Sequence, residues 1–289
     1  MALPLEKLGT RYEARTATID RELARAYAAA TNDRNPRYAS GELAPPVFAV
    51  VPTWDAMMVA LHDVVPAEDQ VAMLHAEQDM HFFRPLVPGR ELSTFAEVTS
   101  LRSGRMGTRF TMRVASSYDD GRPVVEQFAT MLIRGVEPGE DGGSPPPPHA
   151  FPAEAKAAKL AQVATVIDPD QATRYAEASG DRNAIHLDDA VARSVGLPGV
   201  ILHGMCTMAI CGRSVVDELA GGDPTQLRRL AVRFYRPVFP GNDLVTTLFD
   251  AGTEGDRRIV AFEASSAGKV VVRDGRAELG PSGPGSGDG

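Results

Sequence analysis

The chain has 289 residues, of which 43% are hydrophobic, so it can form one large domain or two of ordinary size with packed cores. Its 30 Lys and Arg residues against 38 Asp and Glu give a formal net charge of −8, which argues against nucleic acid as the main partner. The start lacks the features of a signal peptide, and no apolar stretch approaches the roughly 20 residues of a membrane span, so we expect a cytoplasmic protein without a membrane partner.

One stretch near the start of the chain occurs a second time near its middle. Residues 19–35 and 167–183 share an Ile-Asp pair, a Tyr-Ala pair and a complete Asp-Arg-Asn at an offset of 148 (167 − 19). Residues 82–89 and 234–241 share the pattern Phe-x-Arg-Pro-x-x-Pro-Gly at an offset of 152 (234 − 82). This repetition predicts two domains of one kind, which we place at residues 1–136 and 161–279.

The first copy begins with a helix and ends with strands. Asp20 is the expected N-cap of the opening helix, because it precedes the first apolar pattern. A central apolar segment carries Trp54, Met57 and Met58, which we expect in the core. After this segment the sequence alternates and is enriched in β-branched and aromatic residues, as strands are. The expected strands are residues 81–83, 94–98, 108–114 and 125–133.

Residues 137–160 separate the two copies and are expected to form a linker. The segment Glu137–Pro148 is rich in Gly, Pro and acidic residues, which we expect neither to bury a core nor to continue a sheet. Residues 280–289 have no apolar side chain to anchor them, so we expect a disordered tail.

The second copy repeats this order with clearer helix boundaries. Asp168 is the expected N-cap of its first helix, Pro169 takes the first helical position, and Gln171 is placed to close a capping box. This helix should end near Gly180.

A short helix at residues 189–194, a turn at 196–199 and a longer apolar helix at 204–219 should follow. Cys206 and Cys211 lie on the longer helix at a spacing that suits neither a disulfide nor zinc, so we expect two reduced packing residues. Strands are expected at residues 230–236, 244–249, 258–264 and 269–273. A helix followed by an antiparallel meander predicts an α+β fold in which each sheet wraps its helix.

A carboxylate, an amide and an imidazole lie close together after the first helix of the second copy. Asp181 and His186 can hold and deprotonate one water molecule, and Asn183 can fix their orientation or that of the substrate. The N–H at Gly204, at the start of the long helix, can stabilise an oxyanion. These four residues form the candidate catalytic site, and they suit the hydration of an activated double bond.

The segments 175–186 and 196–205 closely resemble the signature of the MaoC-like (R)-specific enoyl-CoA hydratases, also called hydratase 2. Asp181, Asn183, His186 and the His-Gly pair ending at Gly204 match that motif, and residues 234–241 resemble a strand lining the same family's tunnel. Two such units resemble the double-hotdog members of the family. The resemblance implies a double hotdog fold with one working site in each chain.

Two departures from the family pattern locate that site. Ala184 replaces a common proline, which leaves every polar group of the motif in place. In the first copy Tyr38 stands opposite His186, and residues 44–51 align with 197–204 without the His-Gly pair. We therefore expect residues 33–35 to be only a retained structural turn, and the first half to be degenerate. Its central segment would then shape room for a long acyl chain.

Other ligands fit the motif less well. The ligand positions that a calcium loop needs are missing, and zinc held by Asp181, His186 and His203 would lack any recognised spacing, so we predict no metal. Nucleotide-binding glycine motifs and a serine-hydrolase elbow are absent from the sequence. Arg84 and Arg236 can contact coenzyme A phosphates, although their equivalent placement in both halves suits a structural role equally well.

The sequence thus predicts reversible (R)-specific hydration of trans-2-enoyl-CoA to (R)-3-hydroxyacyl-CoA. No separate cofactor is needed, because coenzyme A is part of the acyl-CoA substrate. One alternative is a dehydratase acting on carrier-protein-bound fatty-acyl or polyketide chains. Another is a non-catalytic acyl-thioester-binding or scaffold subunit. Homodimer formation is left open by the sequence.

Overall fold

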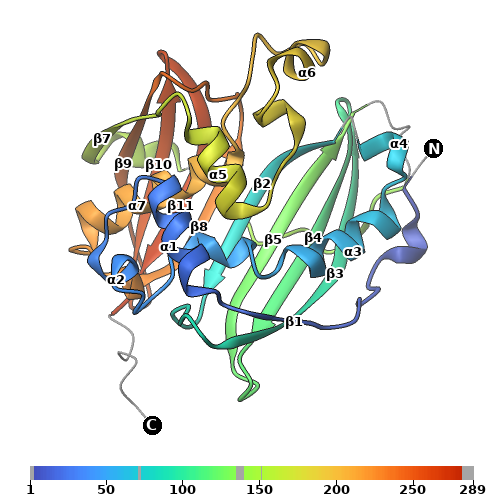
Figure 1. The fold of residues 1–289 in the computed structure, drawn as a ribbon, viewed down its shortest axis with the longest axis horizontal. Helices are drawn as coiled ribbons and strands as arrows, with labels where there is room; N and C mark the ends of the chain where they lie inside the picture. Colours follow the sequence, from blue (N-terminus) through green and yellow to red (C-terminus); the bar gives the residue numbers. More distant parts are fainter. Residues whose placement is uncertain (1–2, 71–72, 135–139, 151, 282–289) are drawn as a thin grey trace.

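Two copies of one unit lie side by side in the protein, each with a helix packed on the inner face of an antiparallel sheet (Figure 1). The computed structural model describes residues 3–70, 73–134, 140–150 and 152–281. This arrangement confirms the predicted α+β double hotdog fold. Within the described residues, none of the helices combines the length and the apolar composition that a membrane span requires.

The first copy contains short helices, one central helix and five strands within the described residues. Its elements are η1 Leu5–Lys7, β1 Arg15–Thr18, α1 Arg21–Ala30, α2 Pro36–Ala39, η2 Pro46–Val50, α3 Trp54–Val64, α4 Ala67–Gln70, β2 Met73–Phe82, β3 Glu91–Gly104, β4 Gly107–Ser117 and β5 Pro123–Ile133. On α3, Met57 is buried, and Trp54 and Met58 are partly buried and pack against the same cluster, as predicted for core residues.

The second copy repeats this order. Its elements, with those of the connecting segment, are β6 Gly142–Gly143, η3 Ala153–Ala157, β7 Lys159–Val166, α5 Gln171–Ser179, η4 Ala184–His186, α6 Asp189–Ser194, α7 Gly204–Leu219, η5 Pro224–Gln226, β8 Leu227–Phe234, β9 Asp243–Glu254, β10 Arg257–Ser266 and β11 Lys269–Leu279. The predicted bounds of α6 and α7 are confirmed, and both cysteines of α7 are free and buried.

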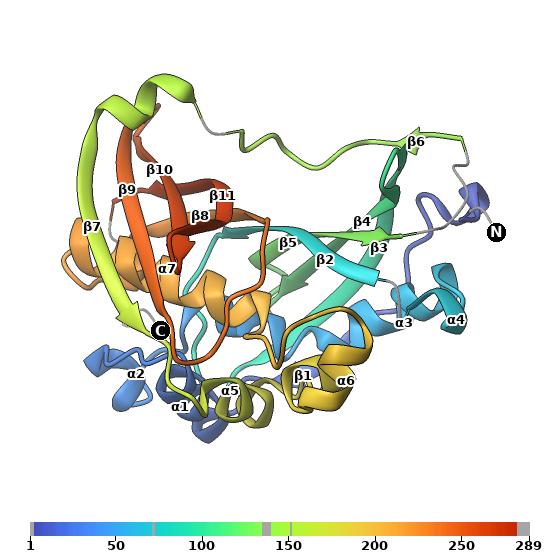
Figure 2. The same cartoon turned by 90° about the horizontal axis from the view of Figure 1, so that it is seen from above.

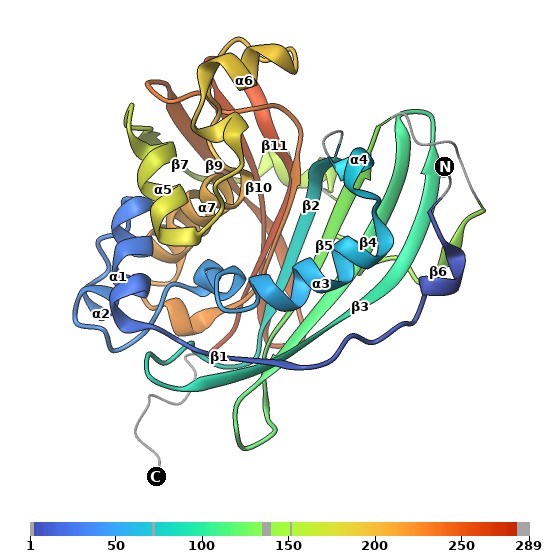
Figure 3. The same cartoon turned by 45° about the vertical axis from the view of Figure 1, so that its right-hand side comes forward.

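The two copies join through antiparallel pairing of β2 with β8, in the strand order β1-β3-β4-β5-β2-β8-β11-β10-β9-β7. In Figure 3, the strands β3, β4, β5 and β2 of the first copy lie to one side, and β11, β10 and β9 of the second copy lie to the other. Asp79 lies opposite Ala231, its own counterpart at the offset of 152, so an approximate two-fold axis passes through this pair. Beside the axis, Arg229 donates from Nε and Nη2 to the two carboxylate oxygens of Asp79, at 2.9 and 2.8 Å. A buried ion pair therefore holds the halves together.

The predicted meander is only partly correct. Strands β9, β10 and β11 follow one another in the sheet, but β8 pairs with β11 instead of β9. The physical reason is that β8 has a strand on both edges, β11 on one side and β2 of the other copy on the opposite side. Most residues of β8 are buried, and the strand pairs on both of its edges at the centre of the molecule.

The first helices of the two copies begin differently. Asp20 caps α1 as predicted, accepting a hydrogen bond from Leu23 N at 2.7 Å. In the second copy the predicted start was wrong, because α5 begins at Gln171 and the Asp168 carboxylate is taken by an ion pair with Arg174. Half of the expected capping box survives, since the Asp168 N–H donates to Gln171 Oε1 at 3.0 Å.

The connection between the copies crosses the face of the sheet opposite the helices (Figure 2). Here the sequence interpretation was wrong, because β6 pairs with β3 and so continues the sheet. His149 is buried in the same segment, and β7 already begins at Lys159. Residues 137–139 and 151 of the predicted linker and residues 282–289 of the predicted tail lie outside the described residues.

Candidate active site

The turn after α5 is built from local hydrogen bonds. Gly180 ends the helix in the left-handed region, at φ +80°. Asp181 Oδ1 then accepts from the Asn183 N–H at 3.1 Å, and Asn183 Oδ1 accepts from the Ile185 N–H at 3.3 Å, which starts η4. Asn183 is exposed, and its observed bonds fix the turn and hold the Asp181 carboxylate.

The first copy forms the same turn without the histidine. Asp33 Oδ1 accepts from the Asn35 N–H at 3.0 Å, and Asn35 Oδ1 accepts from Arg37. Tyr38 is buried at the position of His186, and burial raises the pKa of Asp33 to about 6. The turn therefore forms in both halves, whereas the imidazole beside it is present in one.

His186 is buried on η4 and has one nitrogen available. Its Nδ1 lies 2.8 Å from the carbonyl oxygen of Ile201, which can only accept a hydrogen bond, so Nδ1 carries the proton. The Nε2 atom is then left with a lone pair. Burial lowers the pKa of His186 below its usual 6.5, which favours this neutral form.

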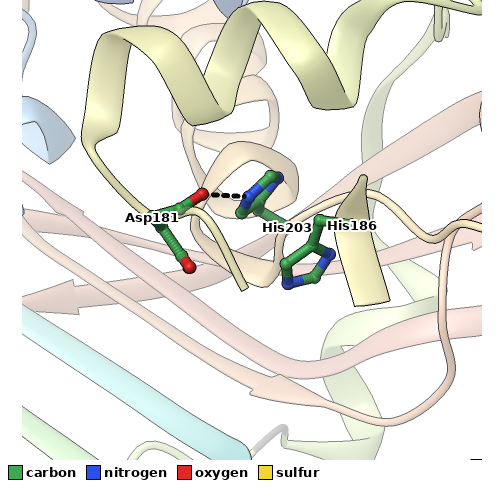
Figure 4. A group of neighbouring side chains, drawn as sticks. All are labelled: Asp181, His186 and His203. Atoms are coloured by element: carbon green, nitrogen blue, oxygen red, sulfur yellow. Dashed lines mark hydrogen bonds between the residues drawn. The ribbon is translucent and has the colours of Figure 1, made fainter. Parts of the chain in front are cut away.

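His203 lies next to both Asp181 and His186 (Figure 4). Its Nε2 donates to the backbone oxygen of Asp181 at 3.0 Å, and its ring stacks on His186 with 3.8 Å between centroids. Burial lowers the pKa of His203 to about 4, so both stacked rings are neutral near pH 7. Its hydrogen bond to Asp181 gives His203 a specific position, in which it joins the Asp181 turn to the start of α7.

Gly204 is the first residue of α7, and its N–H makes no hydrogen bond to any described residue. A Cβ atom at this position would lie 3.3 Å from the Phe234 ring, so glycine keeps a close approach to the backbone open. In the first copy the corresponding N–H, that of Val51, donates to Phe48 O at 2.9 Å. At this aligned position, the free N–H thus occurs in the half that has His186.

Asp181, His186 and His203 each offer one ligand atom, and these atoms lie within 4.8 Å of one another. This is the one group that could hold a metal within the described residues. Each histidine donates one N–H to a backbone carbonyl and keeps one lone pair, which is the form in which a histidine can bind a metal. The carboxylate beside the Nε2 lone pair of His186 equally suits one polarised water molecule.

The first half has a hollow lined by Phe82, the counterpart of Phe234, and by Leu227 from the other copy. Arg84 also lines it and forms an ion pair with Asp120 at 3.2 Å. Arg236, its counterpart, donates to Val270 O at 3.0 Å. The contact with coenzyme A suggested for these arginines stays a prediction.

Comparison with known proteins is consistent with this arrangement. A family model described as a MaoC like domain matches residues 151–270, and one described as a FAS1-like dehydratase domain region matches residues 6–127. The chain is 33% identical over 213 residues to 3-hydroxyacyl-thioester dehydratase Y of Mycobacterium tuberculosis, covering 72% of each protein. It is 28% identical over 262 residues to the enoyl-CoA hydratase ChsH3 of the same organism, covering 88% of each. The crystal structure of a MaoC-like dehydratase from Phytophthora capsici matches with a TM-score of 0.82 and 26% identity, over 95% of this chain and 96% of that one.

Proposed function

Because this chain belongs to the MaoC-like family and is a hydro-lyase of the hydratase and dehydratase type, we propose that it hydrates trans-2-enoyl-CoA to (R)-3-hydroxyacyl-CoA. The reaction runs in both directions. The observation that carries the proposal is the free lone pair of His186 beside the Asp181 carboxylate, close to the free N–H of Gly204. The (R) configuration is supported by the likeness of segments 175–186 and 196–205 to the hydratase 2 motif.

In hydration, a water molecule held between Asp181 and His186 attacks C3 of the enoyl thioester. The electron pair of the double bond moves to the thioester oxygen, where the Gly204 N–H and the N-terminal end of α7 stabilise the negative charge. The Asp181 and His186 pair accepts a proton from the water and returns one proton to C2. The pair ends in its starting state, and the sum of the reaction is addition of water.

The acid–base pair and the oxyanion donor each contribute to the rate enhancement on a known scale. Positioned acid–base groups supply roughly 10²- to 10⁴-fold, and an oxyanion donor contributes on a similar scale. A neutral imidazole is a suitable base near pH 7, and burial keeps His186 in this form. Asn183 acts by holding Asp181 through its backbone N–H.

The first copy provides a matched control for the test. Crotonyl-CoA loses absorbance as its double bond is hydrated, so turnover can be followed directly. We expect Asp181→Asn to reduce kcat/KM at least about 100-fold, because the acid–base pair is broken. Asp33→Asn changes the same kind of turn in the first half and should retain activity. Chiral analysis of the product should give the (R) alcohol.

Two results would contradict the proposal. Absence of turnover by the wild type with both crotonyl-CoA and a long-chain enoyl-CoA would remove the hydratase activity as stated. Full activity of Asp181→Asn would place the reaction elsewhere in the molecule. The same assay with crotonyl-loaded carrier protein separates the carrier-protein alternative, because kcat/KM for that substrate would then exceed the value for crotonyl-CoA.

A further inference from the structure

Strand β2 of the first half extends past the end of β8 and reaches the candidate active site of the second half. Its pairing with β8 covers Glu77–His81, whereas His75 lies beyond the last pair. The His75 ring packs edge-on against Phe234, with 5.1 Å between ring centroids. Phe234 is the ring next to Gly204. His75 therefore stands at the wall of the site, although it belongs to the other half of the chain.

A β-bulge turns His75 toward a buried polar partner. The register between β2 and β5 shifts between His75 and Glu77, which leaves Ala76 as the extra residue. The bulge brings His75 and Gln78 to the same side of the strand, three residues apart, and His75 Nε2 lies 3.0 Å from Gln78 Oε1. Burial lowers the pKa of His75 to about 4, although the Gln78 bond, the Asp181 charge and the Glu77 backbone all raise it.

The direction of the hydrogen bonds identifies which nitrogen of His75 carries the proton. Thr53 Oγ1 donates to Ala49 O at 2.8 Å, so it accepts from Gln127 Nε2, at 2.9 Å. Gln127 Oε1 then accepts from Gln78 Nε2 at 3.2 Å, which leaves Gln78 Oε1 as an acceptor. The chain ends at the carbonyl oxygen of Ala49, which can only accept a hydrogen bond, so each group in the chain donates toward it. His75 Nε2 therefore donates to Gln78 Oε1, and His75 Nδ1 holds a lone pair.

This polar chain occurs in one copy and is replaced in the other. Offsets of 152 and 153 relate His75, Gln78 and Thr53 to Leu227, Leu230 and Cys206. Leu227 lines the hollow of the degenerate half, where no counterpart of His186 exists. The bulge itself is retained, because the pairing of β8 with β11 shifts at the same place, between Leu227 and Arg229. The strand geometry therefore does not require the polar chain.

Building on the proposed function, the geometry points to His75 as a substrate-binding residue that accepts a hydrogen bond, through Nδ1, from the first amide N–H of the pantetheine arm. Asp181 and His186 take the water, and Gly204 takes the thioester oxygen. The next polar group along the arm is that amide, a donor that a neutral imidazole lone pair complements. Coenzyme A and carrier proteins share this arm, so the residue serves either source of substrate.

Two small thioesters test this assignment. Crotonyl-N-acetylcysteamine carries the amide, and the crotonyl thioester of 2-mercaptoethyl acetate replaces only its N–H by an ester oxygen. We expect the wild type to favour the amide substrate about tenfold in kcat/KM, the scale of one hydrogen bond. His75→Leu should bring this ratio close to one. His75→Asn, whose amide oxygen can stand near the position of Nδ1, should keep part of the preference, and Asp33→Asn should keep all of it.

Equal turnover of both compounds by the wild type would overturn the assignment. An unchanged ratio in His75→Leu, which is what equal losses on both compounds give, would also overturn it and leave His75 with a purely structural role. If the small thioesters turn over too slowly, ¹⁵N spectra with butyryl-CoA give the answer, because the Nδ1 signal of His75 must shift on binding in the wild type. If the wild type does not hydrate crotonyl-CoA, the proposed function fails, and the crotonyl-CoA assay detects that outcome separately from the role of His75.

Discussion

The stacked imidazoles of His186 and His203 show how single residues set the chemistry of this site. Each ring donates one N–H to a backbone carbonyl, of Ile201 and Asp181 respectively. Burial lowers the pKa of both, and protonating either ring would place a charge 3.8 Å from its neighbour. The backbone thus selects the tautomer, and burial selects the neutral state.

The pH dependence of the reaction follows from this neutral state. Because the pKa of His186 is lowered below 6.5, the base is active above that value and loses activity as the pH falls through the lowered pKa. We expect the acidic limb of the kcat/KM profile with crotonyl-CoA to have its midpoint below pH 6.5. An acidic limb centred above pH 7 would contradict this assignment of the base. Circular dichroism at each pH separates loss of the base from unfolding.

Gly204 is the second residue whose role depends on a specific contact. A methyl group at this position would stand 3.3 Å from the Phe234 ring, closer than most Cβ contacts. Gly204→Ala should therefore shift the ring or the start of α7 by a few tenths of an ångström and misplace the oxyanion donor. We expect kcat/KM to fall about tenfold or more while the unfolding temperature stays nearly unchanged. Retained activity would show that the donor lies elsewhere.

Among the helices and strands, the sequence predicted those that are marked by local sequence signals. The bounds of α6 and α7 were predicted because caps and apolar runs mark them, and Asp20 caps α1. Most of β2 was missed, since His75, Glu77 and Asp79 make its sequence read as polar. Their partners come from β8 and from the connecting segment, which no local pattern reveals. For the same reason the sequence interpretation could not place His75 beside the site.

Helix α6 and the loop after it hold the carbonyl group that orients His186. Asp189 Oδ1 accepts from the Val200 N–H at 2.9 Å, and its other oxygen pairs with Arg193 at 3.0 Å. Asp189→Ala should loosen the loop that carries Ile201 and lower kcat/KM several-fold, with a loss of at most about 1 kcal/mol in the free energy of unfolding. Asp170→Ala, on the exposed start of α5, is the control. Equal activity in both variants would exclude this role of α6.

At the scale of the whole molecule, the repeated sequence identified the two copies but not how they pack into one core. A single buried core includes Ile19 and Tyr27 of the first copy and Ile167 and Tyr175 of the second. The two tyrosine hydroxyls, which are counterparts at the offset of 148, lie 3.2 Å apart across the approximate axis. Residues of the first copy, which lacks a counterpart of His186, therefore contribute to the core that both copies share.

The connecting segment fastens the halves through His149, which bonds to Glu77 of the first copy at 3.2 Å and to the carbonyl oxygen of Asp274 of the second at 2.7 Å. The His149 pKa is raised by Glu77 and that carbonyl against burial, so its stabilising effect is complete below about pH 6.5 and is lost as the pH rises through the raised pKa. The Glu77 pKa is lowered to about 2 by His149 and Arg233 against burial, so its effect is complete above about pH 4.5 and is lost toward pH 2. The pair stabilises the protein most between these limits.

His149→Gln should accordingly lower the free energy of unfolding by about 2 kcal/mol at pH 6, because it removes a buried charged partner of Glu77. At pH 9 the difference from the wild type should shrink, since His149 is then neutral in both states of the wild type. Urea unfolding at the two pH values measures this, and His62→Gln, on the exposed side of α3, should show no difference at either. A loss that is as large at pH 9 as at pH 6 would mean that His149 acts through packing alone, and that its charge does not help to join the halves.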